Sequence, residues 1–124
     1  MKALLVKPET KPEVVEIENS LRTLQSVVGG YIECIYPFED DVALICNEEG
    51  KLNGMPLNRA LRDEDGNICD VIAGPFLITG LTEEDFGSLS CALTKKYYDM
   101  FYCPEVFMRV DGRIVALRVK GADV

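Results

Sequence analysis

The sequence predicts a single α+β domain over residues 1–124, with a mainly antiparallel sheet, two helices and a C-terminal β-hairpin. Short apolar runs rich in β-branched residues recur along most of the chain, and such runs are typical of strands. Only two segments carry apolar residues at helical spacing. An Asp-Gly pair, which favours a type I′ turn, separates the last two strand-like runs. The order strand, strand, helix, several strands, helix, hairpin favours an antiparallel sheet with helices on one face.

The first half of the chain is expected to form four strands and one helix. Asn19-Ser20 offers an N-cap for the helix, and Gly29-Gly30 offers a C-terminal stop. The expected elements are a strand at 2–7, a strand at 13–18, a helix at 21–28, and strands at 31–36 and 42–46, the last two paired as a hairpin.

Glycine and proline divide the second half. Gly74-Pro75 predicts a bulge or sharp bend between two strands, because proline cannot donate to a sheet ladder. Residues 82–85 (TEED) have the pattern of a capping box that opens a helical turn. The expected elements are a helical turn at 57–62, strands at 68–73 and 76–81, a helix at about 89–101, and a hairpin with strands at 106–110 and 113–119. The basic residues of the hairpin are expected to face solvent and block sheet-to-sheet pairing; they are Arg109, Arg113, Arg118 and Lys120.

Length and composition are those of one globular domain, with 124 residues of which 48% are hydrophobic and 27% charged. The apolar runs are far shorter than a membrane span. The first residues lack a signal-peptide cleavage pattern. The sequence therefore predicts a cytoplasmic protein that does not cross a membrane.

The side chains that most often perform catalysis are missing. There is no histidine, which removes the commonest zinc ligand and the usual general base. The cysteines form no Cys-x-x-Cys pair and lie in apolar stretches, so we expect buried thiols and not disulfides or metal ligands. We therefore expect a protein that is not an enzyme, with no cofactor and no metal.

The net charge of −8 is concentrated in the middle of the chain, where residues 39–85 hold twelve acidic residues against three basic ones. Such a surface repels nucleic acid, so direct DNA binding is not expected. A solvated surface that keeps the protein soluble is the simplest interpretation. The alternative is that acidic residues 39–41 and 63–65 imitate the phosphates that a nucleic-acid-binding protein normally grips.

One segment is a candidate binding site. After the strand at 42–46 the chain becomes polar and irregular, which is where binding residues tend to lie. Lys51 and Arg59 suit phosphate, and Asn47 and Asn58 suit a base or a ribose. The alternative is a turn whose polar side chains bond their own backbone. The candidate ligand-binding residues are Asn47, Glu48, Glu49, Lys51, Asn58, Arg59 and Asp70.

Residues 27–81 resemble a family of small uncharacterised proteins that share a domain of unknown function. The family occurs in bacteriophages and in plasmids and conjugative elements of Gram-positive gut bacteria. The segments that carry the resemblance are 29–33 (GGYIE), 47–52 (NEEGKL), 55–60 (MPLNRA) and 70–74 (DVIAG). Met55 stands where the resemblance leads us to expect leucine.

The resemblance implies a mobile-element setting and no assigned activity. Small proteins of such elements often act as accessory or counter-defence factors, so the expected partner is a small nucleotide ligand or a host defence protein in a bacterial cytoplasm. Ligand capture around residues 47–59 is the preferred hypothesis, and blocking of a nucleic-acid-binding defence enzyme is the alternative. A structural or regulatory role and a homo-oligomer remain open.

Overall fold

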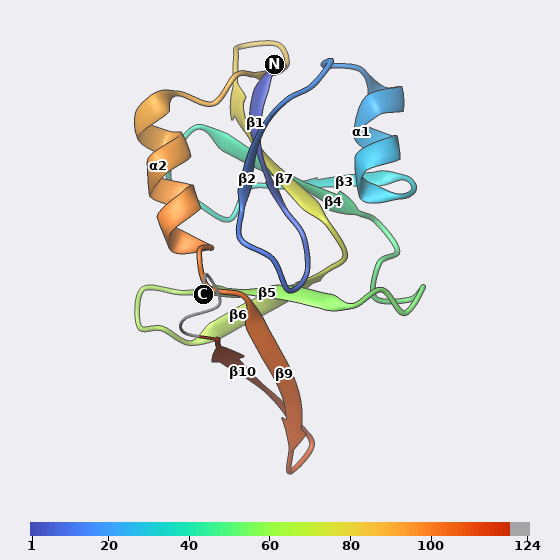
Figure 1. Cartoon of the computed structure of the whole chain (residues 1–124), viewed down its shortest axis with the longest axis vertical. Coiled ribbons are helices and arrows are strands. Elements are labelled where there is room, and N and C mark those ends of the chain that lie inside the picture. The colour runs from blue at the N-terminus through green and yellow to red at the C-terminus, as the bar shows by residue number, and fades with distance from the viewer. Residues whose placement is uncertain (120–124) are drawn as a thin grey trace.

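The computed structural model of the protein describes residues 1–119. Two helices and ten strands form within this range (Figure 1). They are β1 (Lys2–Val6), β2 (Glu13–Glu16), α1 (Leu21–Val28), β3 (Ile32–Ile35), β4 (Val42–Asn47), β5 (Leu57–Arg62), β6 (Ile68–Ala73), β7 (Phe76–Leu81), β8 (Phe86–Gly87), α2 (Cys91–Met100), β9 (Glu105–Val110) and β10 (Arg113–Arg118). The predicted α+β class, the two helices and the C-terminal hairpin are confirmed.

The main sheet has the strand order β2-β1-β7-β4-β3, with β8 paired to β7. Every pairing in it is antiparallel. The predicted hairpin of the strands at 31–36 and 42–46 is confirmed by the pairing of β3 with β4. The most apolar strands, β4 and β7, lie inside the sheet and are almost completely buried, because both of their faces are covered.

The two helices lie on opposite faces of this sheet (Figure 1). Alternate residues of β7 show the arrangement, since Ile78 packs in one core with Tyr97 of α2 and Leu77 packs in the other with Leu24 of α1. The expectation that both helices cover one face is therefore wrong. Nearly every central strand residue is apolar, so the sequence carried no alternation that could distinguish a one-sided sheet from a two-sided one.

The predicted N-cap and C-terminal stop of α1 are confirmed. Ser20 Oγ accepts a hydrogen bond from Thr23 N–H, and Gly29 ends α1 in the left-handed conformation with φ 80°. Ser90 caps α2 in the same way through Leu93 N–H. The predicted capping box at 82–85 does not open a helix. Thr82 Oγ1 instead accepts from Asp85 N–H within a turn that leads into β8.

Residues 57–62 form strand β5 and not the expected helical turn. β5 pairs antiparallel with β6 in a separate two-stranded sheet. The chain leaves this sheet at Gly74, whose φ of 77° makes the bend predicted at Gly74-Pro75, and β7 then enters the main sheet. The helix-forming residues of β5 are overridden because pairing with β6 and burial of Asn58 and Arg59 both require an extended chain.

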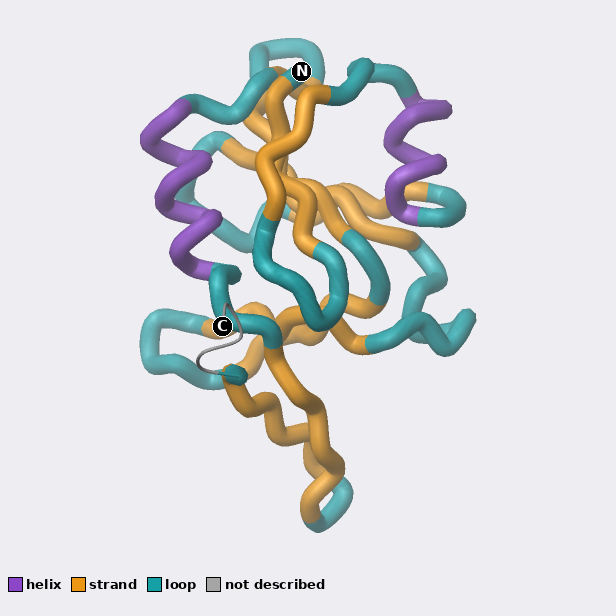
Figure 2. The backbone as a smooth tube through the Cα atoms, in the orientation of Figure 1, coloured by secondary structure: helices purple, strands orange, loops and turns teal. Residues whose placement is uncertain are grey.

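The C-terminal hairpin, β9 with β10, projects away from the two sheets (Figure 2). Asp111 and Gly112 both have positive φ, at 50° and 78°, as a type I′ turn requires. The predicted solvent-facing arginines Arg109, Arg113 and Arg118 are exposed. Lys120 lies outside the described residues.

The cysteine prediction is only partly correct. All five thiols are free. Cys46 is buried and Cys34 and Cys103 are half-buried, but Cys69 and Cys91 are exposed. Within residues 1–119 no helix has the length and apolar character needed to cross a membrane.

Candidate functional site

The seven predicted site residues do not form one site. Asn58 and Arg59 lie inside the protein with exposed fractions of 0% and 1%. The other five line a surface cavity of about 320 Å³; they are Asn47, Glu48, Glu49, Lys51 and Asp70. The five cavity residues surround a hollow at the surface, whereas Asn58 and Arg59 lie in β5, where their side chains are buried.

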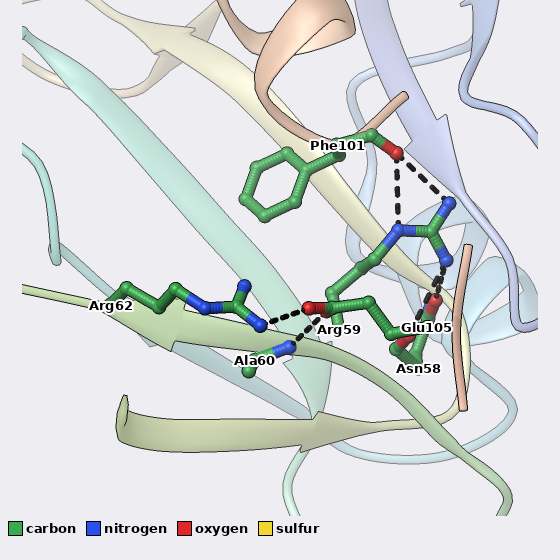
Figure 3. A network of polar contacts seen from close by, with 6 residues as sticks. All are labelled: Asn58, Arg59, Ala60, Arg62, Phe101 and Glu105. Atoms are coloured by element: carbon green, nitrogen blue, oxygen red, sulfur yellow. Dashed lines mark hydrogen bonds and ion pairs between the residues drawn. The ribbon is translucent and has the colours of Figure 1, made fainter. Parts of the chain in front are cut away.

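Arg59 is a structural residue in a network of buried polar contacts (Figure 3). Its Nε and Nη2 donate to the Phe101 carbonyl oxygen over 3.1 and 2.9 Å, and Nη2 also donates to the Thr10 carbonyl over 2.6 Å. Its Nη1 donates to Asn58 Oδ1 over 2.9 Å. The guanidinium therefore joins β5 to the end of α2 and to the β1–β2 loop, and has no donor directed at a ligand.

The charge of Arg59 is held without a carboxylate in direct contact. Burial lowers its pKa, and the negative charge of the nearby Glu105 opposes that shift. Glu105 is 6% exposed; its Oε2 accepts from Ala60 N–H over 2.7 Å, and its other oxygen pairs with Arg62 (Figure 3). Glu105 was not predicted, because its role depends on the position of β5.

Asn58 completes this network from the other side. Its Nδ2 donates to the carbonyl oxygens of Val6 and Gly74 over 2.9 and 2.8 Å. Among the described residues, Thr79 Oγ1 is the one buried side-chain nitrogen or oxygen without a partner. The polar atoms of Asn58 and Arg59 are thus used internally.

Asn47 also has a structural function. Its Nδ2 donates to the Val28 carbonyl at the end of α1 over 3.1 Å, and its Oδ1 accepts from Glu49 N–H over 2.8 Å. A Cβ on Gly30 would come within 2.8 Å of Asn47 Nδ2, so a side chain there would displace the amide that bonds the Val28 carbonyl.

The segments that carry the family resemblance meet around the same loop. Glu48 N–H donates to the Tyr31 carbonyl, and Gly74 N–H donates to the Pro56 carbonyl. A Cβ on Gly74 would come within 2.6 Å of Met55 Sδ. These contacts hold the loop between β4 and β5 against both sheets. They agree with the alternative expectation that this segment is a structural turn.

The surface cavity is acidic. Glu33 from β3, Glu48 and Glu49 line it, and none of these three carboxylates forms an ion pair with another described residue. The single cation of its wall, Lys51, already pairs with Asp70 over 2.7 Å. The cavity therefore offers free negative charge and hydrogen-bond acceptors, and little to neutralise a phosphate.

Cys46 is the one thiol in the cavity wall. Burial, with the negative charge of Glu33 added, raises its pKa to about 11. Since the thiolate is the nucleophile, burial disfavours the reactive form of this thiol. No group of three or more potential ligands in the part of the chain that the structure describes is placed to hold a metal ion.

A second hollow lies between α2 and the β5–β6 sheet. Two adjoining cavities of about 300 and 780 Å³ share Phe38, Leu61 and Met100 as apolar walls. Glu39, Asp63 and Glu64 line the larger one. Two acidic segments distant in sequence thus meet at one groove, which we call the α2 groove.

Asp40 ties the same groove to α2 and gives a pH-dependent contact. A hydrogen bond from Lys96 Nζ over 2.6 Å holds the pKa of Asp40 below its ordinary value, and one from Tyr97 Oη over 2.6 Å adds to the effect. Burial and the same bond raise the pKa of Tyr97.

A carboxylate with a lowered folded-state pKa stabilises above its unfolded value of about 3.9, and this stabilisation is lost as pH falls through the folded value. We expect the stability of the parent protein to fall more steeply between about pH 5 and pH 3 than that of Asp40→Asn. Urea unfolding across this range measures the difference. Parallel profiles for the two proteins would contradict the assignment.

Comparison with known families places most of the chain in a family of unknown function. A family model described as "Domain of unknown function (DUF3846)" matches residues 1–102. No curated protein and no solved structure matches the chain. The match includes both helices, the main sheet and the β5–β6 sheet, and ends before the C-terminal hairpin.

Proposed function

The chain belongs to the DUF3846 family of unknown function, and we propose that it is a non-catalytic protein that binds a small polar ligand in the cavity formed by residues 47–51 and Asp70. The observation that carries this proposal is convergence. β3, the loop after β4, and β6 each bring polar side chains to one hollow of about 320 Å³, within the size range of small-molecule sites.

The geometry changes the expected chemistry of the ligand. With Arg59 buried, Lys51 alone is left to contact a phosphate, and it is already paired. Glu33, Glu48 and Glu49 favour an ammonium group, with hydroxyl groups also able to donate to them. We therefore favour a cationic or hydroxyl-rich ligand over a nucleotide.

The absence of histidine and the raised pKa of Cys46 support a role without catalysis. The resemblance to proteins of phages and conjugative elements supports an accessory, counter-defence setting in the cytoplasm of a bacterial host. Capture of a small signalling molecule would fit that setting.

A second candidate function rests on the α2 groove. Its apolar walls and its acidic rim of Glu39, Asp63 and Glu64 suit a basic protein surface. Arg62 and Lys96 also line the groove, but each pairs with a carboxylate, Glu105 and Asp40 respectively. In the same setting the partner would be a nucleic-acid-binding defence enzyme, whose phosphate-binding groove the acidic rim would occupy.

The ligand proposal is tested by calorimetric titration with two probes, spermidine for a polyamine and AMP for a nucleotide. We expect saturable one-to-one binding of spermidine that weakens with added salt. Replacing Glu48→Gln and Glu49→Gln together should reduce its affinity by at least about tenfold, since two free carboxylates are lost.

The matched control removes two exposed carboxylates outside the cavity, with Glu83→Gln and Glu84→Gln, and should leave binding unchanged. AMP binding that is stronger than spermidine binding and is lost in Lys51→Met would restore the nucleotide version. If neither probe saturates, the ligand proposal fails. The second candidate would then predict that charge reversal at Glu39, Asp63 and Glu64 abolishes binding to a nucleic-acid-binding enzyme.

A further inference from the structure

The C-terminal hairpin has one apolar face with no cover among the described residues. The register pairs Val110 with Arg113, Met108 with Val115, and Val106 with Leu117, so these side chains share a face. Val106, Met108, Val110 and Leu117 have exposed fractions of 46–50%. An isolated two-stranded hairpin is marginally stable in water, so an arm of this kind gains from a partner.

The apolar face continues into a hollow at the base of the hairpin. This hollow measures about 580 Å³ and is lined by Leu57, Pro104, Val106 and Val119, with Glu9 at its edge. We call it the root hollow. Glu9 is exposed and takes part in no ion pair with another described residue, and the same holds for Arg113 at the hairpin tip.

We propose that the occupant of this surface is a second copy of the chain, whose hairpin lies antiparallel across the first, face to face. A six-residue strand is roughly 20 Å long. The tip of each hairpin then lies over the root hollow of the other copy. Val110 enters the apolar part of the hollow, and Arg113 meets Glu9 of the second copy.

Three features favour a second copy over an unrelated protein. The surface is self-complementary, with a cation at the tip and a carboxylate at the root, as a two-fold interface requires. The apolar face carries no charge between these ends. The arm projects from the body, which leaves its apolar face open to a second arm at the spacing of about 10 Å that packed sheets adopt (Figure 1).

The size of the surface sets the expected strength. Two short hairpin faces with the root hollows bury less than the roughly 800 Å² per partner of a standard interface. The dimer is therefore expected to be weak, with dissociation in the micromolar range. This interface lies outside the ligand cavity, and its root hollow shares only Glu105 with the α2 groove among the described residues, so it does not rest on the proposed function.

Sedimentation velocity of the full chain from about 1 µM to about 500 µM, the range in which such an interface dissociates, tests the proposal. We expect a concentration-dependent monomer–dimer equilibrium. Met108→Ser should raise the dissociation constant by at least about tenfold, as loss of a central apolar contact does. Ile114→Ser is the matched control, because Ile114 is 43% exposed on the opposite face, and it should leave the constant unchanged.

Charge exchange identifies the arrangement of the two copies. Arg113→Glu and Glu9→Arg should each weaken the dimer, and the double variant should return the dissociation constant to within about threefold of the parent. A protein that is monomeric at every concentration, or a dimer that Met108→Ser does not weaken, would overturn the proposal. Equal weakening by Ile114→Ser would overturn it as well.

Discussion

Arg59→Ala is expected to lower the free energy of unfolding by about 3–5 kcal/mol. The substitution removes the donors of the buried Phe101 carbonyl oxygen and of the partly buried Thr10 carbonyl oxygen, and leaves a cavity at a position that is 1% exposed. The Arg59 side chain that joins the β1–β2 loop, strand β5 and the end of α2 would be lost. Thermal or urea unfolding monitored by circular dichroism measures the loss.

Arg59→Lys separates charge from geometry. Lysine keeps the positive charge but not the planar fork that reaches Phe101 and Thr10 together, so most of the destabilisation should remain. Arg22→Ala is the matched control, because Arg22 is exposed on α1, and it should change stability by no more than about 0.5 kcal/mol. An Arg59→Ala protein as stable as the parent would contradict the structural role and make ligand binding by Arg59 plausible again.

Glu105→Ala is expected to cost about 2–4 kcal/mol of unfolding free energy. It leaves the buried Ala60 N–H without an acceptor, separates Arg62 from its carboxylate, and removes the negative charge that supports the buried Arg59. Glu105 lies beyond the residues that match the family model, so this variant also tests whether the C-terminal segment is integral to the fold.

A double-mutant cycle of Glu105→Ala with Arg62→Ala separates the contribution of the Arg62 ion pair from that of the bond to Ala60 N–H. If the ion pair carries most of the stabilisation, the second substitution adds little to the first. If the bond to Ala60 N–H dominates, Arg62→Ala alone costs little, since Arg62 is partly exposed. Additive losses from the two single variants would show that the pair itself contributes nothing.

These expectations affect how activity measurements should be interpreted. Loss of function in Arg59→Ala would follow from a weakened fold and would say nothing about a ligand. Glu48 and Glu49 are better positions for that purpose, because both are exposed and line the cavity. Substitutions there are expected to leave stability nearly unchanged.

The sequence by itself determined the features that depend on near neighbours. Ser20 and Gly29 end a helix through contacts within a few residues, and Asp111-Gly112 adopts positive φ for local steric reasons. The α+β class and the β3–β4 hairpin followed from the order and spacing of apolar runs. Four of the seven predicted site residues line one cavity because they are nearly consecutive, whereas Asp70 joins them from β6 through the fold; the four are Asn47, Glu48, Glu49 and Lys51.

Only the tertiary structure decided the rest. Arg59 contacts Phe101 and Thr10, which are 42 and 49 positions away, so nothing near it in the sequence shows that it is buried. Contacts outside the segment also decided that residues 57–62 form a strand, since they pair with β6. The packing of the whole chain placed the helices on opposite faces and left Cys69 and Cys91 exposed. A local pattern fixes the shape that a segment can adopt, whereas burial and partners depend on which distant segments fold against it.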